Sequence, residues 1–188
     1  SLENPRSYVD TNLTGTFNVL EVARQLGVKH LVFASTSSVY GGNSKTPFAV
    51  GNPVDQPRSL YAATKRSDEL MSETYAHLYG LRLSGLRFFT VYGARQRPEM
   101  AITLFLKKII RGEPITVFGD GSMKRDFTHV ENVVEANMAA AVEPAACGRV
   151  MNVAIGASHT LNELVRTLGD LLDSDIEPEY AEPRPGDV

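Results

Sequence analysis

The chain has 188 residues, a formal net charge of −3, and 43% hydrophobic and 22% charged side chains. This composition is typical of a globular protein with one substantial core, and its slightly acidic balance argues against nucleic acid or an anionic membrane as a partner. No apolar run approaches the ~20 residues of a membrane span. The single cysteine, Cys147, cannot form an intrachain disulfide, so we expect a protein of a reducing compartment, the cytoplasm.

Apolar residues recur at helical spacing in several stretches, and short apolar runs of the strand type lie between them. Strands that alternate with helices indicate an α/β protein with a parallel sheet. Residues 35–59 are rich in Gly, Asn, Pro and Ser, so we predict a loop there, over an active site. The predicted helices cover residues 8–26, 61–79, 101–111, 130–142 and 160–172, and the predicted strands cover residues 31–34, 83–89, 115–118 and 150–153.

A cluster of hydroxyl side chains, residues 35–38, directly follows the first predicted strand. A buried parallel strand that ends in hydroxyl residues places their oxygens at the carboxyl edge of the sheet, where open α/β folds bind ligands. A serine-rich turn without a binding role is the alternative interpretation of this segment alone.

A tyrosine and a lysine, Tyr61 and Lys65, lie four residues apart at the start of the second predicted helix. At this spacing both side chains share one helical face, about one turn apart. A tyrosine titrates near ~10 in water, and a neighbouring ammonium group favours its ionised form. The pair alone is weak evidence for chemistry, but the hydroxyl cluster upstream of it makes the combination much rarer.

Four spaced motifs follow one another along the chain: S-T-S-S-V-Y-G at 35–41, Y-A-A-T-K at 61–65, L-R-F-F-T-V-Y-G at 86–93 and G-D-G-S-M-K-R-D-F-T-H at 119–129. In this order they make the chain resemble the extended short-chain dehydrogenase/reductase family, and within it the NAD-dependent nucleotide-sugar 4-epimerases. The resemblance runs from residue 4 to residue 188 and is closest to the UDP-glucuronate 4-epimerases. It implies a Rossmann-like parallel sheet with a small substrate-binding lobe.

The resemblance also implies a division into two parts. Residues 1–93 would be the C-terminal part of the NAD-binding Rossmann domain with the catalytic residues. Residues 94–188 would be mainly the nucleotide-sugar-binding lobe, with about 130–172 returning to the Rossmann domain. A dinucleotide site normally begins with a strand, a glycine-rich turn and a helix, yet the sequence contains no G-x-G-x-x-G. We therefore expect a fragment in which the N-terminal half of the Rossmann domain is missing.

The mechanism implied by the resemblance is transient oxidation of a UDP-sugar at carbon 4, with NAD as cofactor and a 4-keto intermediate. Tyr61 would be the base, Lys65 would support the phenolate and bind the nicotinamide ribose, and Thr36 would bridge substrate and tyrosine. Ser35 and Phe88 are the further expected cofactor contacts, together with Tyr61 and Lys65. Asn12 matches a supporting asparagine beneath the active site.

The expected sugar contacts favour a uronate. Ser37 and Ser38 stand where sugar dehydratases of the family carry an acidic pair, so a dehydratase is disfavoured, whereas serines can hydrogen-bond a carboxylate. Thr90 and Arg97 resemble the carboxylate contacts of UDP-glucuronate 4-epimerases, because an arginine fork can pair with a carboxylate through two hydrogen bonds. Arg95 is the rival arginine in the same loop.

Three other residues match family positions that contact the nucleotide. Arg125 is the expected diphosphate contact, and Arg184 and Asp187 are expected to contact phosphate and ribose. Asp126 and His129 could be mistaken for a catalytic pair, but neither occupies a catalytic position of the family, and we expect structural roles for them. The histidines lack metal-ligand spacing, so we expect no metal site.

The predicted reaction is the epimerisation of UDP-glucuronate to UDP-galacturonate. A UDP-glucuronate decarboxylase is the nearest alternative, although such enzymes usually carry Asn at the position of Thr90. UDP-glucose 4-epimerase activity, or a catalytically inactive fragment that only binds UDP-sugar, also remains open. The resemblance further implies a homodimer formed through the Tyr61 helix and the helix before it.

Overall fold

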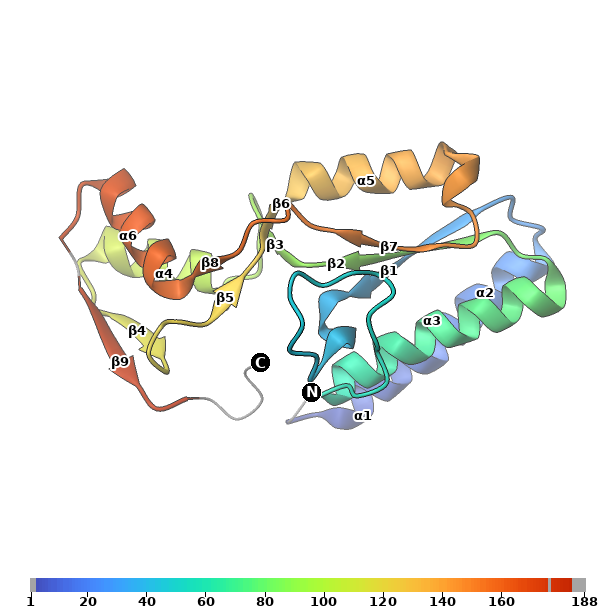
Figure 1. Ribbon diagram of the computed structural model, residues 1–188, viewed down its shortest axis with the longest axis horizontal. Helices are drawn as coiled ribbons and strands as arrows, with labels where there is room; N and C mark the ends of the chain where they lie inside the picture. Colours follow the sequence, from blue (N-terminus) through green and yellow to red (C-terminus); the bar gives the residue numbers. More distant parts are fainter. Residues whose placement is uncertain (1–2, 176, 184–188) are drawn as a thin grey trace. The chain divides into compact units, whose positions relative to one another are not determined.

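The computed structural model describes residues 3–175 and 177–183, and the chain divides into two compact units (Figure 1). Each unit has its own hydrophobic core. Unit 1 contains Ser1–Phe89 and Glu131–Val153, and unit 2 contains Thr90–Val130 and Ala154–Val188.

Unit 1 is built on a three-stranded parallel sheet, which confirms the predicted α/β class. Its strands are β1 (Leu31–Thr36), β2 (Leu83–Phe88) and β7 (Val150–Val153), in the order β1-β2-β7. Its helical segments are α1 (Pro5–Tyr8), η1 (Val9–Thr14), α2 (Gly15–Gln25), η2 (Ser37–Tyr40), α3 (Leu60–Tyr79), α5 (Val130–Val142) and η3 (Pro144–Ala146).

Helices cover both faces of this sheet, with α2 and α3 on one face and α5 on the other (Figure 1). Side chains three positions apart on a strand point to opposite faces, so Leu83 packs toward α2 and α3 while Leu86 packs toward α5. The buried residues under α2 and α3 are Leu20, Ala23, Leu81 and Leu83, and those under α5 are Leu86, Ala140, Ala146 and Val153.

The helix predicted over residues 8–26 is a continuous helical stretch whose middle part, η1, is π-helical. Asn4 caps its beginning, since the Asn4 side chain accepts a hydrogen bond from the first turn. A π-helical turn is rare and often marks a functional site. Within it, Asn12 donates a hydrogen bond of 2.9 Å to Oγ1 of Thr64 and thereby connects η1 to α3.

The loop predicted before the Tyr61 helix begins after η2 and closes on itself at residues 41 and 56. Gly41 has a φ of 53°, and a Cβ atom added to it would collide with the carbonyl group of Gln56. The backbone amide of Gly42 donates to the same carbonyl oxygen at 3.3 Å. The two ends of the loop are therefore held together, as in a compact Ω-loop.

The described residues of unit 2 form two packed helices and three short strand pairs. Its elements are α4 (Ala101–Arg111), α6 (Leu161–Leu172), β3 (Thr90–Tyr92), β4 (Ile115–Phe118), β5 (Lys124–Arg125), β6 (Phe127–His129), β8 (His159–Thr160) and β9 (Pro178–Ala181). β3 pairs with β6 and β4 with β9 in parallel, whereas β5 and β8 are antiparallel. The core between α4, α6 and β4 consists of Phe105, Ile109, Ile115, Val117, Val165 and Leu168.

Helix α6 shows where the expected division of the chain differs from the structure. We expected a return to the Rossmann part over about residues 130–172, but the segment in unit 1 ends at Val153. The reason is that Val165 and Leu168 of α6 bury their side chains against α4. The predicted helix start is confirmed, because Thr160 and Glu163 form a reciprocal capping box.

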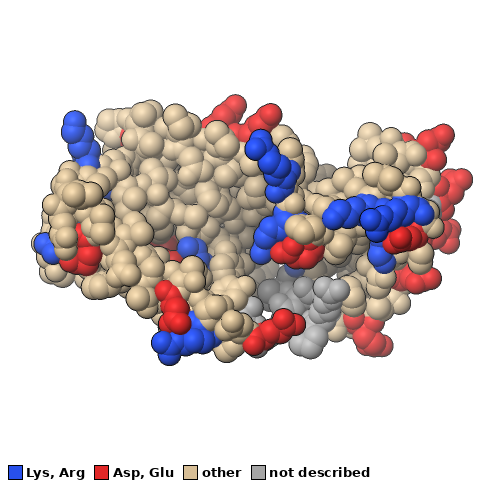
Figure 2. All heavy atoms as spheres, turned by 180° about the vertical axis from the view of Figure 1, so that it is seen from behind, with Lys and Arg blue, Asp and Glu red and all other residues tan. Residues whose placement is uncertain are grey.

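Surface charges of both signs are interspersed on the face shown in Figure 2. Among the residues that the structure describes, no helix is long and apolar enough to cross a bilayer. The same residues contain no cluster of three or more side chains that could hold a metal ion.

Candidate active site

Helix α3 presents the predicted tyrosine and lysine at its beginning. The Ser59 side chain accepts a hydrogen bond of 3.1 Å from the Ala62 amide and so determines where the helix starts. Tyr61 therefore lies in the first turn and Lys65 one turn later. The ring of Tyr61 contacts the ring of Tyr8 edge-to-face, with centroids 6.0 Å apart. This contact orients the phenol ring from the side of α1.

Lys65 forms an ion pair with Asp68, three residues further along α3. The Lys65 Nζ to Asp68 Oδ2 distance is 2.9 Å, and the side chains are 16% and 1% exposed. Burial raises the pKa of Asp68 above its ordinary value, although the hydrogen bond from Lys65 acts in the opposite direction. Sequence reasoning missed this contact, which pairs the Lys65 ammonium group with a carboxylate.

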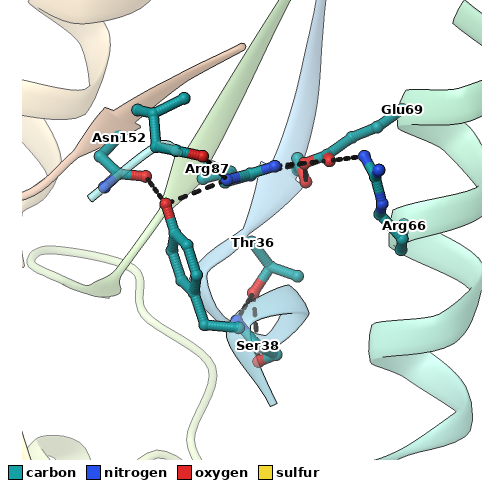
Figure 3. Close-up of polar contacts among 9 residues, drawn as sticks. Thr36, Ser38, Arg66, Glu69, Arg87 and Asn152 are labelled. Atoms are coloured by element: carbon teal, nitrogen blue, oxygen red, sulfur yellow. Dashed lines mark hydrogen bonds and ion pairs between the residues drawn. The ribbon is translucent and has the colours of Figure 1, made fainter. Parts of the chain in front are cut away.

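The hydroxyl cluster forms the end of β1 and the 3-10 turn η2. Thr36 caps this turn, and its Oγ1 accepts a hydrogen bond of 3.2 Å from the Ser38 amide. The Thr36 hydroxyl also donates to Ser38 Oγ at 3.2 Å (Figure 3). Both β1 and η2 pack against α3. The structure thus places Thr36, Ser37 and Ser38 at the carboxyl end of the sheet, beside the helix that carries Tyr61.

Next to this cluster, a buried network of charged and polar side chains connects β1, β2 and α3 (Figure 3). Arg87 of β2 donates to both carboxylate oxygens of Glu69, at 2.8 and 2.9 Å. Ser35 donates to Glu69 at 2.5 Å, and Arg66 donates to it at 2.8 Å. Ser35, the expected cofactor contact, therefore has its hydroxyl inside the protein, where it is 3% exposed.

Electrostatics inside the network favour the ionised form of Glu69. Burial alone would raise the pKa of this carboxyl group, but hydrogen bonds from Arg87 and Ser35 outweigh it, and the pKa is lowered. Sequence reasoning did not identify Glu69 or Arg87. The available signal was the charged Arg87 inside an otherwise buried strand, directly opposite Ser35 in the register of β1 and β2.

The same network fastens the loop that follows η2. Arg87 donates to the hydroxyl of Tyr40 at 3.0 Å and to the carbonyl oxygen of Val50 at 3.2 Å. Tyr40 in turn donates to Asn152 at 2.6 Å, and Asn152 donates to the Phe48 carbonyl at 3.0 Å. The rings of Tyr40 and Phe48 are stacked, with centroids 4.6 Å apart. The buried Arg87 of β2 and the half-buried Asn152 of β7 therefore hold the loop at residues 48 and 50.

Phe88 lies on the opposite face of the sheet from this network. Its side chain packs against the buried cluster beneath α5, together with Leu86 and Val153. The half-buried Phe88 side chain thus contributes to the core beneath α5.

The remaining predicted sugar contacts belong to unit 2. Thr90 begins β3, and its backbone amide donates to the carbonyl oxygen of Asp126 at 3.0 Å. Arg97 lies in the following loop with a side chain 73% exposed, and its Nε lies 3.5 Å from a carboxylate oxygen of Glu99. Arg95, the rival, is also exposed and has a φ of 65°. Arg97 is thus placed on the surface, where it has room to contact a ligand.

Asp126 has a structural role, as the sequence suggested. Its two carboxylate oxygens accept hydrogen bonds from the backbone amides of Ile155 and Gly156, at 3.0 and 2.7 Å, and from the hydroxyl of Thr128. The ring of His129 contacts the ring of Tyr92 at a centroid distance of 5.2 Å. The described contacts of these side chains serve packing within unit 2.

A cavity of about 860 Å³ opens within unit 2 between the end of β4 and the end of β9. Arg125 lies close in sequence to its lining and donates to Met123, which lines the cavity, at 2.8 Å. Arg184 and Asp187, the other expected nucleotide contacts, lie outside the described residues. The lining residues are Phe118, Gly119, Asp120, Ser122, Met123, Tyr180, Ala181, Glu182 and Pro183.

Known proteins resemble both the sequence and the fold. A UDP-glucuronate 4-epimerase from Thermodesulfobacterium geofontis is 44% identical over 100% of this chain and 58% of its own length. A solved UDP-glucose 4-epimerase from Thermotoga maritima, with UDP-glucose, matches with a TM-score of 0.91 and 35% identity over 100% of this chain and 62% of its own. A UDP-glucuronic acid 4-epimerase from Bacillus cereus, with UDP-glucuronic acid and NAD, has a TM-score of 0.91 and 30% identity over 97% and 58%.

The chain thus spans about three fifths of the length of the relatives that it matches. The model of the NAD dependent epimerase/dehydratase family matches residues 1–154, which include the sheet of unit 1 and the Tyr61 helix. With this match over most of its length, the chain belongs to the NAD-dependent epimerase/dehydratase family.

Proposed function

We propose that this chain carries the catalytic and sugar-binding part of an NAD-dependent UDP-sugar 4-epimerase, and that its reaction converts UDP-glucuronate to UDP-galacturonate. One observation carries the proposal. The Tyr61 and Lys65 helix packs beside the Thr36 to Ser38 turn at the carboxyl end of a parallel sheet. A phenol, an ammonium group and hydroxyl groups at such an edge suit proton transfer to and from a sugar hydroxyl.

Tyr61 takes the proton of the sugar's 4-hydroxyl in one direction and returns it in the other. The Thr36 hydroxyl hydrogen-bonds that 4-hydroxyl and aligns it, and Lys65 supplies positive charge beside the phenolate. These groups also suit the nicotinamide and ribose end of NAD, because they offer hydroxyl and ammonium donors at the sheet edge. NAD, when bound, supplies reversible hydride acceptance at carbon 4.

Arg97 is the proposed contact for the carboxylate of the uronate. Ser37, Ser38 and Thr90 are proposed to donate hydroxyl hydrogen bonds to the same sugar. Arg125, Arg184 and Asp187 are the proposed contacts for the nucleotide. The exposure of Arg97 and its long 3.5 Å contact with Glu99 support this assignment, because a new carboxylate would displace only a weak surface pair.

Proton NMR of UDP-glucuronate, incubated with the purified chain and NAD, tests the proposed reaction directly. Appearance of the anomeric signal of UDP-galacturonate would support the epimerase. A UDP-pentose with loss of carbon dioxide would indicate a decarboxylase instead. Turnover of UDP-glucose but not of UDP-glucuronate would reassign the sugar. Unchanged sugar together with saturable binding of UDP-glucuronate would leave a UDP-sugar-binding chain without catalysis.

Replacing Arg97 by alanine is expected to weaken UDP-glucuronate binding about tenfold or more and UDP-glucose binding less than twofold, because a charged hydrogen bond contributes about 1.5–3 kcal/mol. Titration calorimetry with both ligands measures the difference. Arg95→Ala in the same loop is the matched control and should change neither affinity. Equal losses for both ligands in Arg97→Ala would exclude Arg97 as the reader of the carboxylate.

We also propose that the chain forms a homodimer through α2 and α3. Both helices expose large apolar side chains, which commonly mark an interaction surface. Light scattering should give twice the mass of the chain, and a lysine at the exposed Leu70 should reduce this to the mass of one chain. A monomeric parent would contradict the proposal. The exposed apolar residues are Phe17, Val19 and Val22 on α2, Leu26 directly after it, and Leu60, Leu70, Leu78 and Tyr79 on α3.

A further inference from the structure

The hydroxyl turn, residues 36–38, is attached on both sides to one buried ion pair. On one side, Ser35 donates to Oε1 of Glu69 at 2.5 Å. On the other side, Tyr40 at the end of η2 accepts a hydrogen bond of 3.0 Å from Arg87. Arg87 in turn donates to both carboxylate oxygens of Glu69 (Figure 3). These contacts form a closed ring, so the turn cannot shift as a whole without breaking a hydrogen bond to a buried charge.

The backbone of the turn has only weak support from its own segment. The pairing of β1 with β2 reaches Thr36, opposite Phe88, and β1 ends there. Beyond that point the Ser38 amide donates to Oγ1 of Thr36 at 3.2 Å, and the Gly41 amide donates to the Ser38 carbonyl oxygen at 3.1 Å. Both distances are at the long end of the usual range for N–H to O hydrogen bonds. The orientation of the hydroxyl groups therefore depends on contacts from other elements.

Tyr40 provides such a contact, from a side chain that is 1% exposed. Its ring stacks on Phe48 with centroids 4.6 Å apart, but burial of apolar surface is non-directional and does not fix a single orientation. Its hydroxyl donates to Asn152 at 2.6 Å and accepts from Arg87, residues 112 and 47 positions away in sequence. Hydrogen bonds have strict distances and angles, so these two hold the end of η2 against β2 and β7.

We infer that Tyr40 is a positioning residue for the proposed reaction. Its hydroxyl, held by Arg87 and Asn152, fixes η2 and thereby the hydroxyl groups of residues 36–38. The inference rests on the proposed function, in which these groups contact the sugar. A displacement of ~1 Å at a reacting group can cost about 100-fold in rate, so a turn that is held in place before the sugar binds favours catalysis.

The variant Tyr40→Phe tests this, because it removes the hydroxyl and keeps the ring on Phe48. Hydrogen exchange is followed by NMR, residue by residue, on the chain itself. The amides of Ser38 and Gly41 should exchange about tenfold faster than in the parent, since local opening of the turn no longer breaks the buried hydrogen bonds.

Tyr75→Phe is the matched control. Tyr75 is half-buried in the same unit, and its hydroxyl donates to Glu21 at 2.7 Å. The control therefore removes a comparable hydrogen bond that does not attach to η2, and it should leave the two exchange rates within about twofold of the parent. Equal increases in both variants would overturn the inference, because the turn would then respond only to a general loss of stability.

Catalysis provides a second readout. With UDP-glucuronate and NAD, kcat of Tyr40→Phe should fall about tenfold or more, whereas the affinity for UDP, which lacks the sugar, should stay within about twofold. An unchanged kcat in a variant with a loosened turn would overturn the role of Tyr40 in the reaction.

Unchanged exchange at Ser38 and Gly41 would overturn the inference. So would a change confined to the loop amide of Asn52, which donates to the Ala49 carbonyl oxygen, because Tyr40 would then hold only the loop. Circular dichroism establishes that the variant is folded, and Asn152→Leu, which removes the acceptor for the phenol, replaces it if it is not. Exchange needs no turnover, so a failed positioning role and a failed epimerase assignment give different results.

Discussion

Replacing Tyr61 by phenylalanine should abolish epimerisation while UDP-sugar affinity stays within about twofold. The substitution removes the hydroxyl that carries the proton but keeps the ring, and hence the edge-to-face contact with Tyr8. Loss of a positioned base costs about 10²–10⁴ in rate, and here the same hydroxyl serves both directions of the reaction. Product formation by NMR and affinity by calorimetry, measured on the same preparation, give the two quantities.

Tyr79→Phe is the matched control for this experiment. It removes a phenol from the exposed end of the same helix, where Tyr79 contacts Tyr75, and should retain the parent rate. A fully active Tyr61→Phe variant would remove Tyr61 from the mechanism. Equal loss of activity in both variants would instead show that α3 tolerates no loss of a hydroxyl group, and would leave the base unassigned.

Replacing Arg87 by methionine should lower the free energy of unfolding by about 3 kcal/mol or more, because breaking a buried ion pair leaves the other charge without its partner. Arg87 is 3% exposed and Glu69 1% exposed, and Arg66 remains as the only other arginine donor described at Glu69. Urea denaturation measures the change. Arg6→Ala breaks the exposed pair with Asp10 and should leave the unfolding midpoint nearly unchanged, because water screens that pair.

The sign of the pH dependence gives the Arg87 variant a second readout. The network lowers the pKa of Glu69, so its contribution to stability is present above the ordinary value of 4.5 and is lost as the pH falls through the lower folded value. Without Arg87 this contribution shrinks, and the variant should lose less stability than the parent on acidification. An Arg87→Met variant as stable as the parent at neutral pH would show that the pair does not hold the fold together.

Local patterns in the sequence were sufficient for the parallel α/β class, the Tyr61 helix and the hydroxyl turn. These features follow from spacing along one segment: Ser59 caps α3 three residues before Ala62, and Thr36 caps η2 two residues before Ser38. Each motif also carried a family resemblance, which the match over residues 1–154 confirms. Roles of individual site residues, Arg97 above all, stay predictions.

Only the tertiary structure decided which charges meet. Ser35 and Glu69 are 34 residues apart, Glu69 and Arg87 are 18 apart, and Tyr40 and Asn152 are 112 apart, so no local pattern connects them. The register of β1 and β2 places Arg87 opposite Ser35, and burial then makes the ionic partners obligatory. The three-residue spacing of Lys65 and Asp68 is local, but the packing that leaves the Asp68 side chain 1% exposed is tertiary.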